Sequence, residues 1–464
     1  MVSIFYDLET TTTVTVGQIL NYCFTLVDAK FEPIEECAGT VRLSRLELPA
    51  AGAILSNRTD ILHHQRTSSD TEVVAARRIH DFILAATRSR REQVPLIGYN
   101  SARFDLKWIR TVFVRNGLNP YFGGRLVYRD LLQGIRYLSW AEPDFPRPVE
   151  EGREEGDGPR VTLSLEPITR ALGLLSGSQR HEARSDVHLT IALARVCRER
   201  FGHDCSAYQG YEALTLHDAG AGGAVFMQVR PEYDPAKQSR AHRSPITFLA
   251  ADRRGALWID LESYRGGAGR RSIVYVNTAT GQLVCDAEPV RDPDLEALAR
   301  TARAEFAGVA PDNFFARSTC DIECDIYRID MSRIDDLSAA IGEGQRKRAL
   351  KSPADDTWEV FRRHRLANYI RGSGAPSHEA TFERSFREYA EYRYGGRMLI
   401  SRPDEAARFH PTLAEMIVEL RECYRKGTPE DRALLSALHE YYRTSEVAAA
   451  LGVQLELPLD SGEG

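Results

Sequence analysis

The stretch SIFYDLET, residues 3–10, places two carboxylates directly after a run of apolar and aromatic side chains. Ile4, Phe5 and Tyr6 predict a short, mostly buried strand. Residues two apart on a strand point to the same side of a sheet, so Asp7 and Glu9 would stand together on one face. Two carboxylates held so close together repel each other, and a divalent cation would relieve the repulsion. The alternative is that the strand has already ended and both acids lie in a solvated turn.

The composition is that of a globular chain with several domains. Of 464 residues, 43% are hydrophobic and 27% charged, which allows real cores and suggests roughly two to four domains. The formal net charge of −6 means that any nucleic-acid site must be a local basic patch. No stretch approaches a membrane span, the N-terminus lacks a secretory pattern, and the 8 cysteines are scattered. We therefore expect a cytoplasmic protein without membrane contact.

The pattern along the chain changes twice, which predicts three domains and a tail. Residues 1–201 alternate short apolar strands with amphipathic helices, the pattern of an α/β domain. Residues 202–350 contain strand patterns such as PITFLAA and SIVYVN, and predict a smaller β-rich domain. Residues 351–450 have helical periodicity, and residues 451–464 have the character of an exposed tail.

Two further acids stand near predicted helix starts. In GYNSARFDLKWI, Asp105 opens a helix that follows a strand and is expected to end at Gly117. In HEARSDVHLTIA, Ser185 is the predicted N-cap, so Asp186 begins the helix and His181 lies on the preceding loop. Taken singly, these are a surface histidine and ordinary first-turn aspartates, because an acid in a first helical turn is favourable.

Taken together, four acids and a histidine predict a metal-dependent hydrolytic site. Asp7 and Glu9 from one strand, with Asp105 and Asp186 from two other elements, can hold two divalent ions about 4 Å apart for in-line attack on a phosphodiester. Hard carboxylate oxygens select two Mg²⁺ ions, for which Mn²⁺ can substitute. His181 can take a proton from the attacking water, because imidazole titrates near neutral pH.

The order FYDLET, YNSARFD and HEARSD resembles the DEDDh exonuclease superfamily, whose fold is RNase H-like. Within it, the sequence is similar to the bacterial exonuclease I family of single-stranded-DNA 3′→5′ exonucleases over most of its length. SPITFLAADRRGALWIDLE resembles that family's SH3-like domain, and FERSFREYAEYRYGGR resembles its C-terminal helical domain. The resemblance implies a DEDDh exonuclease domain over 1–201, an SH3-like domain over 202–350 and a helical domain over 351–450.

The resemblance also implies a role for each candidate residue. Asp7, Glu9, Asp105 and Asp186 would bind the metal ions, with Asp7 as the bridge and Asp105 acting through water, and His181 would be the general base. The implied reaction releases 5′-mononucleotides from single-stranded DNA. The resemblance also implies a monomeric enzyme that acts in DNA repair or recombination. The chain departs from the family in TTTV after DLET and in an acidic stretch over 148–157, which affects substrate detail and not the reaction type.

Contact with DNA needs positive charge and aromatic faces. The densest basic runs and a tyrosine-bearing segment lie after residue 340, although a charge run is more often a solvated helix face. The predicted strand contacts are Arg346, Lys347, Arg348, Arg362, Arg363, Tyr392, Arg393 and Arg397.

The tail segment VQLELPLD has leucines that alternate with period two, which suits an extended peptide. Such a segment can dock in a partner's groove, and this one resembles the glutamine–leucine peptide by which bacterial replication and repair proteins bind the sliding clamp. Its predicted anchors are Gln454, Leu455, Leu457 and Leu459, and the single-stranded-DNA-binding protein is a second expected partner. The alternative is a helix end or a frayed tail.

Two other functions remain open from the sequence. A 3′→5′ exoribonuclease would use the same four acids, since only tolerance of a 2′-hydroxyl separates the two substrates. An inactive scaffold that binds single strands or partners is the other alternative. All five catalytic positions are filled, which favours an enzyme.

Overall fold

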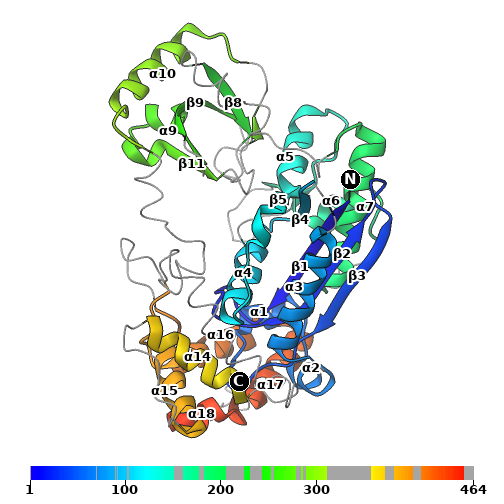
Figure 1. Ribbon diagram of the computed structural model, residues 1–464, viewed down its shortest axis with the longest axis vertical. Coiled ribbons are helices and arrows are strands. Elements are labelled where there is room, and N and C mark those ends of the chain that lie inside the picture. The colour runs from blue at the N-terminus through cyan, green and yellow to red at the C-terminus, as the bar shows by residue number, and fades with distance from the viewer. Residues whose placement is uncertain are drawn as a thin grey trace.

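The structure is a computed structural model, and its elements fall into three regions along the chain. Figure 1 shows one sheet at the centre of the molecule, a second sheet at one end and a group of C-terminal helices at the other. None of the described helices is both long and apolar enough to cross a membrane. The structure describes residues 2–68, 70–88, 90, 92–101, 104–150, 160–176, 182–204, 224–229, 243–251, 255–277, 284–285, 289–310, 357–370, 381–400 and 409–453.

The first sheet has five strands in the order β3-β2-β1-β4-β5. The central strand β1 pairs antiparallel with β2 on one edge and parallel with β4 on the other. Its side chains pack in a core on each face of the sheet, which explains its apolar run. Asp7 and Glu9 both lie within β1, so the predicted strand is confirmed and the solvated turn is excluded. The bounds are β1 Ser3–Thr10, β2 Ile19–Val27, β3 Pro33–Thr40, β4 Val94–Gly98 and β5 Leu126–Asp130.

Helices cover both faces of this sheet and separate its two sets of side chains. Ile4, Tyr6 and Leu8 of β1 pack in one core with α3 and α4, whereas Phe5 packs in another with α5, α6 and α7. Alternation along β1 therefore sends Asp7 and Glu9 toward the side of the sheet that α7 covers. The bounds are α3 Glu72–Arg88, α4 Asp105–Arg115, η1 Phe122–Gly124, α5 Leu131–Ala141, α6 Leu165–Ala171 and α7 Ala183–Phe201, with a short hairpin of β6 Val149–Glu150 and β7 Arg160–Val161.

The second sheet is antiparallel, with the order β11-β10-β9-β8-β12. One of its faces packs around Trp258 and the other packs against α9 and α10. A β-rich region after the α/β domain is confirmed, and its SH3-like character stays a prediction. The bounds are β8 Val225–Val229, β9 Arg243–Ala251, β10 Gly255–Asp260, α9 Leu261–Arg265, η3 Gly269–Ser272, β11 Ile273–Asn277, β12 Val284–Cys285 and α10 Pro293–Glu305.

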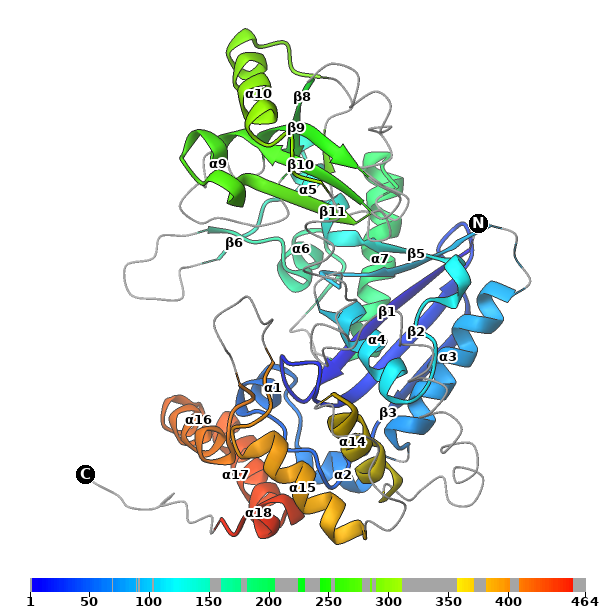
Figure 2. The ribbon, with the colours of Figure 1, turned by 60° about the vertical axis from the view of Figure 1, so that its left-hand side comes forward.

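The C-terminal helices share one hydrophobic core with the N-terminal part of the chain. Val16, Leu48 and Ile54 pack in the same buried cluster as Tyr389 and Tyr442. Figure 2 shows α1 and α2 set among α15, α16, α17 and α18. The helical region is therefore not an independently packed unit. The bounds are α1 Ala51–Ser56, α2 Ile61–Thr67, α14 Thr357–Ile370, α15 Phe382–Tyr394, α16 Leu413–Lys426, α17 Pro429–Arg443 and α18 Glu446–Leu451.

A buried group of charges joins the same two parts of the molecule. Glu72 on α3 accepts hydrogen bonds from Arg115 on α4, at 2.5 and 2.9 Å, and from Arg362 on α14 at 3.2 Å. Burial opposes ionisation of Glu72, yet the guanidinium groups of Arg115, Arg363 and Arg362 hold its pKa well below the usual range. A buried carboxylate needs such partners, because an unpaired charge in the interior is costly.

Candidate active site

The first two acids of the site project from β1 beneath the start of α7. Asp7 and Glu9 lie on the same face of the strand as Phe5, which packs with Val187 of α7. Asp186 is in the first turn of that helix and is 7% exposed. Helix α7 therefore brings a third carboxylate to the two that the strand alternation had already placed together.

An asparagine on β2 fixes the start of α7. The backbone N–H of Ala183 donates to Asn21 Oδ1 at 3.0 Å, and Asn21 stands opposite Glu9 in the β1–β2 pairing. This bond satisfies a helix-end donor that no residue in the helix can satisfy. The helix begins at Ala183, so the prediction of Ser185 as its N-cap is wrong. Sequence reasoning missed Asn21, although a polar residue inside the apolar run ILNYCFTLV is a signal for such a role.

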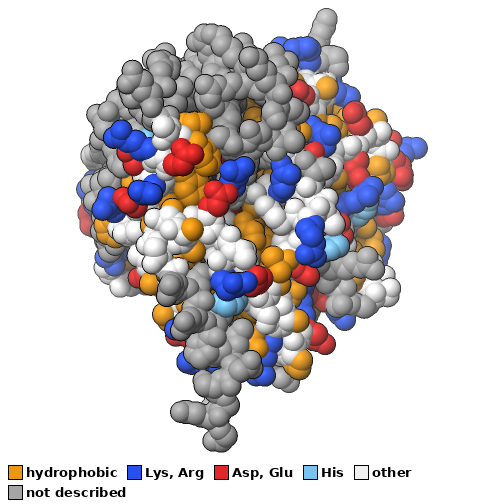
Figure 3. Space-filling view, turned by 90° about the horizontal axis from the view of Figure 1, so that it is seen from below, with side chains coloured by type: hydrophobic (Ala, Val, Ile, Leu, Met, Phe, Trp, Pro, Cys, Tyr) orange, Lys and Arg blue, Asp and Glu red, His pale blue; other side chains and the backbone are white. Residues whose placement is uncertain are grey.

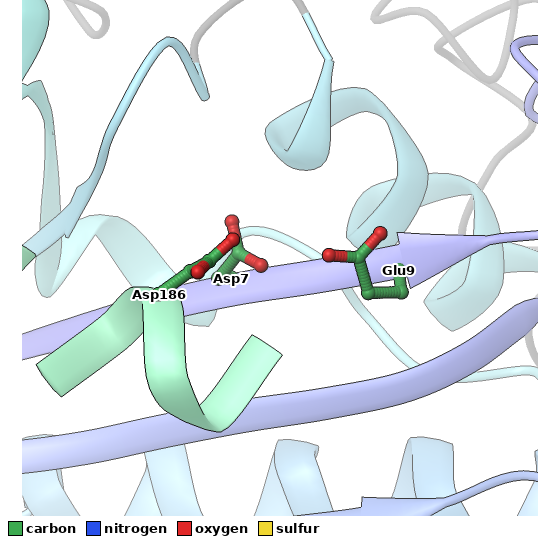
Figure 4. Close-up of side chains that lie close together, drawn as sticks. All are labelled: Asp7, Glu9 and Asp186. Carbon is green, nitrogen blue, oxygen red and sulfur yellow. The ribbon is translucent and has the colours of Figure 1, made fainter. Parts of the chain in front are cut away.

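Three carboxylates converge to within the dimensions of a metal site. Oxygens of Asp7, Glu9 and Asp186 all lie within 4.8 Å of one another. Figure 4 shows the Asp7 and Asp186 carboxyl groups side by side, with Glu9 further along the same strand and turned toward them. All-oxygen, all-anionic donors suit a hard divalent cation, so the residues fit the ions predicted from the sequence.

The electrostatics of the cluster favour the same conclusion. Burial, followed by the charge of Asp186, raises the pKa of Asp7 to about 8. Burial, followed by the charges of Asp7, Asp186 and Asp105, raises the pKa of Glu9 to about 10. Like charges held together in a poorly solvated place keep protons at neutral pH, unless a cation replaces those protons.

The fourth predicted acid, Asp105, lies beside this cluster but not in it. Asp105 is the first residue of α4 and 5% exposed, and it is not part of the group within 4.8 Å. Burial and the charge of Asp7 raise its pKa well above the usual range, so the two carboxyl groups are electrostatic neighbours. The preceding turn is held at Asn100, which has a φ of 56° and donates its backbone N–H to Asp130 Oδ1 at 2.8 Å.

The predicted general base, His181, lies outside the described residues, which resume at Glu182 one residue before α7. Its role stays a prediction. In the sequence, His181 stands five residues before Asp186, the carboxylate that α7 supplies.

Several predicted strand contacts are corrected by the structure, because their side chains lie in the interior. Arg362 and Arg363 are each 2% exposed and pair with Glu359 at 3.0 and 2.7 Å. Arg393 is 0% exposed and pairs with Glu47 at 2.6 Å. Tyr392 is also buried. These four residues hold the C-terminal helices together and against the α/β region, so they are not available to contact DNA.

Arg397 is the predicted DNA contact that the structure places at the surface, with its side chain 69% exposed. The face at the C-terminal helices carries Lys and Arg interspersed with Asp and Glu over the part of the chain that the structure describes (Figure 3). The basic run Arg346, Lys347 and Arg348 lies outside the described residues, as do Gln454, Leu455, Leu457 and Leu459. These residues stay predictions.

The comparison by sequence finds a relative over part of the chain. No family model matches. Exodeoxyribonuclease I of Escherichia coli (strain K12) is 29% identical over 160 residues, which is 33% of this chain and 30% of the relative. The aligned segment thus spans less than a third of the relative's length.

The comparison by structure covers nearly the whole chain. The zinc-ion-bound E. coli ExoI–ssDNA complex matches with a TM-score of 0.64 and 18% identity, over 95% of this chain and 98% of that one. An ExoI/SSB-Ct complex matches with a TM-score of 0.64 and 18% identity, over 96% and 99%. These matches confirm the predicted fold, that of exonuclease I, from the first strand through the C-terminal helices.

Proposed function

We propose that this chain, which has the exonuclease I fold, removes nucleotides from the 3′ end of single-stranded DNA. The observation that carries the proposal is the convergence of Asp7, Glu9 and Asp186 at the position where β1 and α7 meet. The partial sequence match to exodeoxyribonuclease I supports the same activity. The reaction adds water to the terminal phosphodiester, breaks the P–O3′ bond, and leaves a 5′-mononucleotide and a new 3′-hydroxyl.

The carboxylates are proposed to hold two Mg²⁺ ions, for which Mn²⁺ substitutes. Asp7, Glu9 and Asp186 would bind the ions directly, with Asp7 shared between them, and Asp105 would act through water. Bound divalent ions stabilise negative charge on phosphate oxygens and make bound water more acidic. A zinc-bound relative of the same fold supports the use of divalent metal. The raised pKa values of Asp7 and Glu9 mean that the ions would bind in exchange for protons.

His181 is proposed to take the proton from the attacking water. It stands two residues before α7 in the sequence, and α7 carries Asp186 into the carboxylate cluster, which supports this role. A positioned general base contributes roughly 10²–10⁴-fold to the rate. The base does not need to bind metal, because the carboxylates supply the oxygen ligands that the ions prefer.

The partners of the reaction are proposed to follow the related structures. A relative binds single-stranded DNA, and another was solved with SSB-Ct, so we propose single-stranded DNA and the single-stranded-DNA-binding protein as partners here. Arg397 and the basic run at 346–348 are the proposed strand contacts. We also propose that the protein is a monomer that acts in cytoplasmic DNA repair. Its tail is proposed to bind the sliding clamp through Gln454 and Leu457.

The test is a time course on 5′-labelled single-stranded DNA, duplex DNA and RNA with Mg²⁺. A 3′→5′ exonuclease gives a ladder of shortened labelled products, whereas attack from the 5′ end releases the label at once as a mononucleotide. Excess EDTA and the variant Asp7→Asn should each abolish the ladder. The matched control is Asp28→Asn, because Asp28 is a partly exposed acid in the β2–β3 turn, outside the carboxylate cluster.

The three substrates also separate the alternatives. Cleavage of RNA in preference to DNA would replace the proposal with an exoribonuclease. Strand binding without cleavage by the wild-type protein would indicate a scaffold. Substantial cleavage by Asp7→Asn, or in EDTA, would refute the proposed site.

A further inference from the structure

The segment 11–18, which we call the β1–β2 loop, directly follows the strand that carries Glu9. It closes on itself: the Thr11 N–H donates to the Gln18 carbonyl at 2.9 Å, and the Gln18 N–H donates to Thr11 Oγ1 at 2.9 Å. A Cβ on Gly17 would lie 2.7 Å from Thr11 Oγ1. A side chain at Gly17 would therefore force the neighbouring side chains of the loop to move.

Three consecutive carbonyls of the β1–β2 loop point at buried arginines. Arg115 on α4 donates to the Thr15 carbonyl at 3.0 Å and to the Gly17 carbonyl at 2.6 Å. Between them, Arg363 on the C-terminal helix α14 donates to the Val16 carbonyl at 2.6 Å. Both arginines are almost completely buried, so these are charge-assisted bonds in a poorly solvated place, where such bonds are strong.

A second C-terminal helix holds the other end of the loop. Thr11 Oγ1 donates to Glu47 Oε1 at 2.5 Å, and Glu47 receives two bonds from Arg393 of α15, at 2.6 and 3.2 Å. The side chains of Glu47 and Arg393 are both 0% exposed. Thr11 is thus the point where a buried ion pair from the helical region meets the active-site strand.

We infer that α14 and α15 position Glu9 through the β1–β2 loop, with Thr11 and Arg363 as positioning residues. The pairing of β1 with β2 becomes irregular between Glu9 and Thr10, so the ladder does not fix the backbone beyond Glu9 by itself. The bonds of the loop supply that constraint two residues later. The inference rests on the proposed function, because it assigns Glu9 to metal binding.

The competing explanation is that these bonds only stabilise the fold. A purely stabilising contact, when removed, lowers the melting temperature and leaves the affinity of the folded protein for metal unchanged. A positioning contact lowers that affinity as well, because supports behind a metal ligand are worth roughly 10–100-fold in metal binding. Direct metal binding therefore separates the two explanations without requiring strand cleavage.

The experiment measures Mn²⁺ affinity by electron paramagnetic resonance for the full-length wild type, Thr11→Val, Thr11→Ser and Arg363→Lys. Thr11→Val removes the hydroxyl at nearly constant shape and should weaken Mn²⁺ binding about tenfold, whereas Thr11→Ser keeps the hydroxyl and should restore it. Arg363→Lys keeps the charge but loses the guanidinium that contacts Glu359 through Nε and the Val16 carbonyl through Nη1, and should weaken Mn²⁺ binding similarly.

The matched control is Thr87→Val on α3. Thr87 is 1% exposed and donates to the Ile83 carbonyl at 2.9 Å within its own helix, so the same substitution should lower the melting temperature without changing Mn²⁺ affinity. Wild-type affinity in both Thr11→Val and Arg363→Lys would overturn the inference. If the wild type bound Mn²⁺ but cleaved no strand, the proposed function would fail and the positioning result would be unaffected.

Discussion

Replacing Asp7 with asparagine tests the electrostatics of the site through the stability of the metal-free protein. Burial and the charge of Asp186 raise the pKa of Asp7 to about 8, whereas an aspartate in an unfolded chain titrates near about 3.9. Between about pH 5 and pH 7, the folded protein therefore keeps a proton that the unfolded chain has lost. The resulting stability is fully present below the unfolded pKa and is lost as the pH rises through the folded pKa.

The expected size follows from counting protons. Each proton held only by the folded state makes the free energy of unfolding fall by about 1.4 kcal/mol per unit of rising pH. Glu9, whose pKa is raised to about 10, and Asp105, whose pKa is raised well above its usual range, hold further such protons in the same window, so Asp7 supplies one part of a steeper total slope. Asp7→Asn should therefore make the slope shallower by about 1.4 kcal/mol per pH unit, since it removes one of these titrating groups.

The assay is urea unfolding followed by circular dichroism, in EDTA, at several pH values between 5.5 and 7. Comparing the slopes of wild type and Asp7→Asn cancels the contribution of the groups that Asp7 does not influence. Asp28→Asn is the control: backbone amides of Glu32 and Lys30 lower the pKa of Asp28, so it is ionised in both states across the window. Equal slopes for wild type and Asp7→Asn would refute the reasoning.

Three further predictions concern the rest of the chain. His181→Ala should slow cleavage about 10²–10⁴-fold while leaving Mn²⁺ affinity in direct titration unchanged; loss of Mn²⁺ binding would make it a ligand instead. A fragment of residues 1–202 should fail to fold, giving no cooperative melting transition, because it lacks the helices that complete the shared core; a well-folded, active fragment would contradict the shared core. A peptide of residues 450–464 should bind the bacterial clamp with micromolar affinity in calorimetry, and Gln454→Ala with Leu457→Ala should abolish binding without changing cleavage of free DNA; absence of binding by the wild-type peptide would leave an ordinary tail.

The parts of the fold and site that follow from local pattern could be predicted from the sequence. Asp7 and Glu9 share a face because side chains on a strand alternate with a period of two, and the apolar residues before them predict that strand. The structure then adds Asp186 from a helix distant in sequence, a contact for which the resemblance to exonuclease I, and not the pattern, gave the reason.

Contacts between distant segments could not be predicted in this way. Arg362 lies in a basic run with the character of a solvated helix face, but one of its partners, Glu72, is 290 residues earlier in the chain. No period in the sequence shows that pairing. The same holds for Thr11, whose hydroxyl meets an ion pair completed by Arg393, and for Asn21, whose role depends on where α7 begins.

The core shared by the two ends of the chain also sets the order in which the protein can mature during synthesis. Tyr442 donates a hydrogen bond to the carbonyl of Pro49, across 393 residues of chain. At roughly 5–20 residues per second, a ribosome needs on the order of 20–80 s to make that intervening length. Throughout that time Val16, Leu48 and Ile54 lack the C-terminal apolar residues with which they share a core in the finished protein. The nascent chain therefore exposes an apolar surface near the carboxylates of β1, so we expect the proposed activity to develop only after the last helices have left the ribosome.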